Sequence, residues 1–177
     1  MLQSSWETRP PYDVIGGRER CEPAGWSERK IFGQFASHPL EFVLRDFACA
    51  VFVRDGQVLL MKRAPHKAWY PNCWDLVGGH VEPGESVEAA LIREAQEDVG
   101  LTPVRFRWIA ELSEPQESGN PHACFHVYAV TEWVGGEPTL LGDEHTAMQW
   151  VKAARALVLE GIAHPQYARI FRKLAAA

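Results

Sequence analysis

The sequence predicts an α+β fold, with strands on both sides of one central helix and helices again near the end. Two observations carry this prediction. Residues 85–99 contain no Gly or Pro, and strand-like apolar runs stand before and after them. Two shorter helical patterns, 153–159 and 166–174, follow the last of these runs. This order of elements is typical of an α+β or three-layer arrangement.

The first two strands form a predicted hairpin. Residues 47–53 and 57–63 are apolar runs joined by Arg54-Asp55-Gly56, and Asp-Gly between such runs is a hairpin signal. The second run ends in Lys62 and Arg63. Two cations at the end of a strand favour phosphate contact or, equally, a solvated strand end.

A loop is predicted over 64–73. An aromatic side chain in such a loop can stack on a nucleobase, and a lysine can meet a phosphate. The loop holds Lys67, Trp69 and Tyr70, although each of them could simply pin the loop in place. A short strand, 74–77, then leads into Gly78-Gly79, where the backbone can approach other groups closely.

The central helix carries a row of carboxylates. Ser86 stands at the expected N-cap, and Gly100 at the expected C-terminal glycine position. Glu94, Glu97 and Asp98 at i, i+3 and i+4 share one face, where like charges repel. A hard divalent cation would offset that repulsion. A second face is apolar and suited to packing on a sheet; it holds Leu91, Ile92, Ala95 and Val99.

Three more strands are predicted after the helix. Runs 104–112 and 123–133 are rich in Val, Phe, Tyr and Trp, and a polar loop, 113–121, separates them. A further loop, 135–142, precedes Asp143-Glu144-His145, and residues 147–151 read as a strand. His122 and His126 share a face of their strand, which fits hydrogen-bonded strand histidines better than metal ligands.

Composition narrows the class of protein. The chain has 177 residues, of which 46% are hydrophobic and 23% charged, values typical of one globular domain. We expect residues 41–177 to form this domain, and residues 1–40 to be an extension packed on it or on a partner subunit in a possible homodimer. The net charge of −5 argues against nucleic-acid and membrane partners.

Cysteine use and the chain's start favour a reduced, cytoplasmic setting. The four cysteines form no Cys-x-x-Cys pair and no zinc spacing. Cys49 and Cys124 lie in apolar runs and read as buried thiols. The first residues show no signal-peptide pattern, and no apolar run is long enough to span a membrane.

The stretch 79–101 resembles the signature of the Nudix hydrolase family, G-x5-E-x7-R-E-U-x-E-E-x-G-U, in which U is a bulky apolar residue. The matching positions are Gly79, Glu85, Arg93, Glu94, Glu97, Gly100 and Leu101. Ala95 replaces a bulky apolar residue, and Asp98 replaces the second Glu of the pair. Asp98 keeps the charge but reaches one methylene less far.

The resemblance implies a Nudix α/β/α sandwich with a mixed, curved sheet and a loop–helix–loop catalytic signature. It implies a MutT-like pyrophosphohydrolase using Mg²⁺, for which Mn²⁺ can substitute, held by Glu94, Glu97, Asp98 and the Gly78 carbonyl. Arg93 would orient a signature Glu, and Glu144 or Glu94 would take the proton from water. Substrate contacts would come from Lys62, Arg63, Lys67, Trp69, Tyr70 and Glu85.

The sequence leaves the substrate open. A nucleoside triphosphate, including oxidised purine forms such as 8-oxo-dGTP, is the first expectation. ADP-ribose or a nucleotide sugar is the alternative, and a dimer built by residues 1–40 would favour it. Isopentenyl diphosphate isomerases share the implied fold but have a degenerate signature. A non-catalytic nucleotide sensor would lack signature carboxylates, whereas Glu94 and Glu97 are both present.

Overall fold

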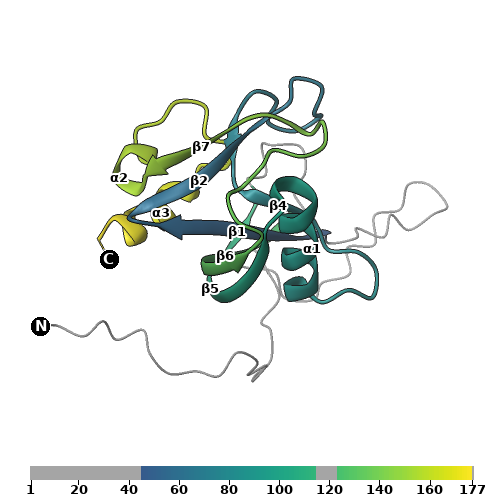
Figure 1. Cartoon of the computed structure of the whole chain (residues 1–177). Helices are drawn as coiled ribbons and strands as arrows, with labels where there is room; N and C mark the ends of the chain where they lie inside the picture. Colours follow the sequence, from purple (N-terminus) through teal and green to yellow (C-terminus); the bar gives the residue numbers. More distant parts are fainter. Residues whose placement is uncertain (1–44, 115–122, 177) are drawn as a thin grey trace, which may run out of the picture.

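A computed structural model describes residues 45–114 and 123–176 (Figure 1). These residues form seven strands and three helices in the order of the chain. They are β1 (Arg45–Arg54), β2 (Gln57–Arg63), β3 (Trp74–Asp75), β4 (Val77–His80), α1 (Val87–Val99), β5 (Thr102–Ser113), β6 (Ala123–Val134), β7 (His145–Lys152), α2 (Ala153–Ala156) and α3 (Tyr167–Ala175).

The sheet is mixed, as the sequence predicts. Its main path runs β3-β2-β1-β6-β5, with β4 added on β1 and β7 added on β2. β1 pairs in parallel with β6 and antiparallel with β4, while Val53 and Arg54 at its end pair with β2. β1 therefore connects β4 and β6 with β2 and, through β2, with β7, which precedes α2 and α3.

Helices cover both faces of this sheet (Figure 1). The side chains of β1 alternate: Ala48 and Ala50 lie in the core beneath α1, whereas Cys49 and Val51 lie in the core that includes Phe171 of α3. Buried residues of α1 complete the first core; they are Val87, Ala90, Leu91, Ala95 and Val99, while Ile92 is only partly buried. The arrangement is the predicted α/β/α sandwich.

Two predicted boundaries are wrong. The strand expected over 74–77 is two strands, because β3 pairs with β2 and β4 pairs with β1. Gly78 and Gly79, which follow the predicted strand, are part of β4. The helix expected over 153–159 ends at Ala156. The amides of Val158 and Leu159 instead bond carbonyls three residues back, which is a tighter turn.

Some expectations fall outside the described residues. They concern the extension 1–40, its role in a possible homodimer, and His122. Within the described part of the chain, no helix has the length and apolar character needed to cross a membrane.

Candidate metal and catalytic site

Helix α1 is bounded as its sequence predicts. The Ser86 hydroxyl accepts a hydrogen bond from the Ala89 amide at 3.1 Å, which satisfies one N–H of the first turn. Gly100 follows the helix with φ 70°, a left-handed conformation that glycine adopts readily. Its amide bonds the Gln96 carbonyl. These caps set where the helix begins and ends.

The carboxylate of Glu94 lies directly against β4. A Cβ atom added to Gly79 would stand 2.4 Å from Glu94 Oε1, which is closer than atoms can approach. Gly78 is equally confined, because a Cβ there would stand 2.0 Å from the Ala48 carbonyl oxygen. Gly79 therefore lets the Glu94 carboxylate of the helix lie close to the backbone of β4, and Gly78 lets β4 lie close to the backbone of β1.

Arg93 gathers three carboxylates and one carbonyl. Its guanidinium binds both oxygens of Glu85, through Nε and Nη2, at 3.0 Å each. Its Nη1 donates to Glu94 at 2.8 Å and to Glu97 at 3.0 Å, and Nη2 donates to the His80 carbonyl at 2.8 Å. The hydrogen bond from Arg93 lowers the pKa of Glu85. The forked geometry fixes the carboxylates in direction as well as position.

Asp98 is the most enclosed of the signature carboxylates. Its Oδ2 accepts a hydrogen bond from the Gly78 amide at 3.2 Å, and its Oδ1 lies 3.8 Å from Nδ1 of His145. Burial raises the pKa of Asp98 to about 7, against the lowering effect of the Gly78 amide, and the nearby carboxylates of Glu94 and Glu144 add to the rise. Burial also raises the pKa of Glu94.

The loop before β7 brings Glu144 to the same place. Amides of the loop bond the last carbonyls of α1, from Thr139 to Val99 at 3.0 Å and from Leu141 to Asp98 at 2.9 Å. The Glu144 carboxylate binds Lys67 Nζ at 2.5 Å, and this hydrogen bond lowers its pKa. Two loops and one helix thus meet around the carboxylates.

The donors present fit a divalent cation of the Mg²⁺ or Mn²⁺ type. The carboxylates of Glu94, Glu97, Asp98 and Glu144 offer oxygen ligands, which hard cations prefer. Burial is the main cause of the raised pKa of Asp98, and the negative charges of the other three carboxylates add to it. The buried Nδ1 of His145 has no hydrogen-bond partner beside them. Glu94 and Glu97 are both bound to Arg93. Among the described residues, another group of possible metal ligands has its ligand atoms closer together than these carboxylates.

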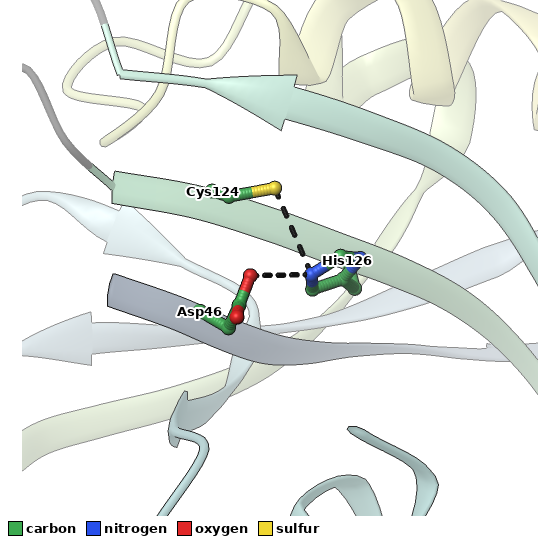
Figure 2. Close-up of side chains that lie close together, drawn as sticks. All are labelled: Asp46, Cys124 and His126. Atoms are coloured by element: carbon green, nitrogen blue, oxygen red, sulfur yellow. Dashed lines mark hydrogen bonds and ion pairs between the residues drawn. The ribbon is translucent and has the colours of Figure 1, made fainter. Parts of the chain in front are cut away.

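That tighter group lies where β1 and β6 begin, and Figure 2 shows its three side chains. His126 Nε2 bonds Asp46 at 2.8 Å and lies 3.6 Å from the sulfur of Cys124. Cys124 is disulfide-bonded, which corrects the expectation of a buried free thiol. Its sulfur is therefore no thiolate ligand, and His126 is a hydrogen-bonded strand histidine, as predicted.

The remaining expected substrate contacts divide into two groups. Arg63 donates to Asp75 at 3.0 Å and to the Trp69 carbonyl at 2.9 Å, and Tyr70 donates to Glu114, so both shape the loop from within. Lys67 reaches Glu144, and Trp69 is 43% exposed. The ammonium group of Lys62 stands 5.8 Å from the ring centre of Trp74.

Sequence reasoning did not single out His145 as a site residue. The structure places it at the start of β7, buried, with Nδ1 toward Asp98. Burial lowers its pKa to about 4, so the ring is neutral at pH 7. The one available signal was its position directly after Glu144 in the sequence.

Comparison with known proteins gives one family. The model of the NUDIX domain matches residues 44–174. The nucleoside triphosphatase NudI of Salmonella agona is 32% identical over 116 residues, which cover 61% of this chain and 82% of that protein.

Solved structures agree with this match. The MutT NUDIX hydrolase from Burkholderia pseudomallei has a TM-score of 0.64 at 30% identity, covering 73% of this chain and 96% of that one. The NUDIX domain of Shewanella oneidensis NrtR, cocrystallised with ADP ribose, has a TM-score of 0.61 at 18% identity. This match covers 74% of this chain and 88% of that one. At that identity the likeness is one of fold alone.

Proposed function

The chain belongs to the Nudix hydrolase family, whose members act on pyrophosphate bonds, and from this premise we propose that it is a Mg²⁺-dependent nucleoside triphosphate pyrophosphohydrolase. One observation carries the proposal: Glu94 and Asp98 of α1 contact the glycines of β4, and Glu144 of the loop before β7 is close enough to raise the pKa of both carboxylates. The match to a nucleoside triphosphatase over 82% of that relative's length supports the substrate class.

The metal would be held by Glu94, Glu97, Asp98 and the carbonyl of Gly78. When bound, Mg²⁺ would neutralise the charge of the polyphosphate and acidify a water, and Mn²⁺ would serve in its place. Arg93 holds Glu94 and Glu97 in position through its Nη1. Glu85 takes the other arm of Arg93 and so belongs to the support of the site rather than to its ligands.

We assign the general base to Glu144. Its side chain is 58% exposed on a loop, whereas Glu94 is packed against Gly79 and bound by Arg93. An exposed carboxylate can reach a water above the site, and the lowered pKa of Glu144 keeps it ionised at neutral pH. Glu94 is better suited to a fixed ligand role, because its neighbours leave its carboxylate little freedom.

Lys67 and Trp69 are the contacts we assign to the nucleotide itself. Lys67 stands beside Glu144, where it can meet a phosphate oxygen, and the exposed ring of Trp69 can stack on a base. Lys62 adds positive charge near the end of β2, the strand that precedes this loop. Arg63 and Tyr70 support this loop through Asp75 and Glu114, so their effect on the substrate would be indirect.

A hydrolysis screen with Mg²⁺ tests the proposal. The panel holds the common nucleoside triphosphates, 8-oxo-dGTP, ADP-ribose, diadenosine polyphosphates and nucleotide sugars, with products separated by chromatography. We expect one triphosphate to be cleaved fastest, to the monophosphate and pyrophosphate. Preference for ADP-ribose or a nucleotide sugar would replace the proposed substrate, and no hydrolysis of any nucleotide would favour an isomerase or a sensor.

A further inference from the structure

His145 is a buried polar side chain for which the proposed chemistry has no use. The side chain is 3% exposed, and its Nδ1 is one of two buried side-chain nitrogen or oxygen atoms without a hydrogen-bond partner in the described part of the chain. An unsatisfied buried polar atom is expensive, so such atoms usually have a reason to be where they are. Here that atom faces Oδ1 of Asp98 at 3.8 Å.

The backbone of His145 is fixed independently of that contact. His145 opens β7 and stands opposite Arg63 in the β2–β7 pairing. The Glu144 carbonyl just before it accepts a hydrogen bond from the Ala64 amide at 2.8 Å. Arg63 is in turn bound to Asp75 at 3.0 Å. The ring is therefore presented to Asp98 from a rigid strand end.

Among the described residues, Asp98 has a hydrogen-bond donor at one of its two carboxylate oxygens. Its Oδ2 accepts from the Gly78 amide, while Oδ1 has the His145 ring as its neighbour beyond hydrogen-bond range. An aspartate reaches one methylene less far than the glutamate that the family signature has at this position. A second donor on Oδ1 would fix the shorter side chain, and with it the peptide of Gly78.

We propose that His145 is a positioning residue, whose Nδ1–H donates to Asp98 Oδ1 and so sets this carboxylate and the Gly78 peptide for the metal. The proposal rests on the metal site of the proposed function. A movement of about 0.8 Å would close the 3.8 Å separation to an ordinary hydrogen bond. Donors behind metal-site carboxylates are a general means of holding them in the geometry that binding requires.

Calorimetric titration with Mn²⁺ alone, without nucleotide, tests this role. We expect His145→Phe, which keeps a ring but no donor, to raise the Kd for Mn²⁺ about 10- to 100-fold. His145→Asn, whose amide nitrogen can occupy nearly the same place, should recover most of the loss. In an Asp98→Asn background, His145→Phe should add almost nothing, because the two residues act as one unit.

Wild-type affinity for Mn²⁺ in His145→Phe, or losses of affinity that add fully in the double variant, would overturn the proposal.

A measurement on the unmutated protein guards against variants that fail to fold. In a ¹⁵N-histidine spectrum, Mg²⁺ should shift the Nδ1 resonance of His145 and leave that of His126 in place; an unmoved His145 resonance would contradict the proposal. If the protein binds Mn²⁺ but hydrolyses no nucleotide, the proposed substrate is wrong. The effects expected of the His145 variants on Mn²⁺ binding do not change in that case.

Discussion

The carboxylate of Glu94 occupies the space in which a side chain at Gly79 would begin, since a Cβ there would stand 2.4 Å from Glu94 Oε1. Gly79→Ala should therefore push Glu94 aside. A misplacement of about 1 Å can reduce a rate by about 100-fold, and we expect a loss of that order in kcat. Steady-state kinetics and Mn²⁺ titration of the variant check this. Unchanged kcat and metal affinity would show that the contact between Gly79 and Glu94 has no part in the site.

Arg93 acts through the forked shape of its guanidinium group, because this group binds three carboxylates and a carbonyl at once. Arg93→Lys keeps the charge but cannot make these bonds together. We expect kcat to fall about 10- to 100-fold, as loss of one or two charge-assisted hydrogen bonds predicts. Arg105→Lys is the matched control, since Arg105 forms an exposed ion pair with Glu132. Equal activity in the two variants would refute a special role for the fork.

The ion pair between Lys67 and Glu144 gives a pH prediction. Lys67 holds the pKa of Glu144 below its usual value, so the base stays ionised to lower pH. In Lys67→Met that pKa should rise, and the acid limb of the kcat/KM profile should move to higher pH. The profile is measured with the fastest substrate of the screen. An acid limb that stays in place would mean that Glu144 is not the base.

Asp98 should make the metal-free protein less stable as pH rises. Its pKa is about 7 in the folded protein and near 3.8 in the unfolded chain, so the folded state binds the proton more tightly. This contribution to stability is full below the unfolded pKa and is lost as pH rises through the folded pKa. Thermal unfolding in chelator, from about pH 4 to about pH 8, checks it against Asp98→Asn.

The comparison isolates one carboxylate because the variant cannot titrate at this position. Relative to the wild type, the Asn variant should gain about 5 °C or more in Tm across that range. Added Mg²⁺ should remove the deficit of the wild type at high pH, because a bound cation offsets the buried charge. A difference in Tm that does not depend on pH would contradict the raised pKa.

The parts of the molecule that depend on local sequence were predicted well. The caps of α1 follow from Ser86 and Gly100, and the hairpin of β1 and β2 follows from Asp55-Gly56. The spacing of Glu94, Glu97 and Asp98 placed them on one face of the helix, because helix geometry alone decides that relation. The mixed sheet came from the family resemblance rather than from any local pattern.

What the sequence could not predict depends on contacts between distant residues. The hydrogen bonds of Arg63 to Asp75 and of Tyr70 to Glu114 join residues that are far apart in the sequence, so no local pattern predicts them. The approach of His145 to Asp98 requires the pairing of β2 with β7, which no local pattern encodes. The break at Leu76 arises in the same way, because β3 and β4 find different partner strands.

³¹P spectroscopy of the reaction with Mg²⁺ and the fastest substrate, run on the wild type and on Glu97→Gln, tests whether the carboxylates of α1 form the catalytic metal site. Glu97 is 60% exposed and bound to Arg93, so loss of its charge should spare the fold. Glu132→Gln, which also removes an exposed, arginine-bound carboxylate, is the control. We expect monophosphate and pyrophosphate from the wild type and the control, and no turnover by Glu97→Gln with an unchanged Tm. A folded Glu97→Gln protein that turns over like the wild type would contradict the site.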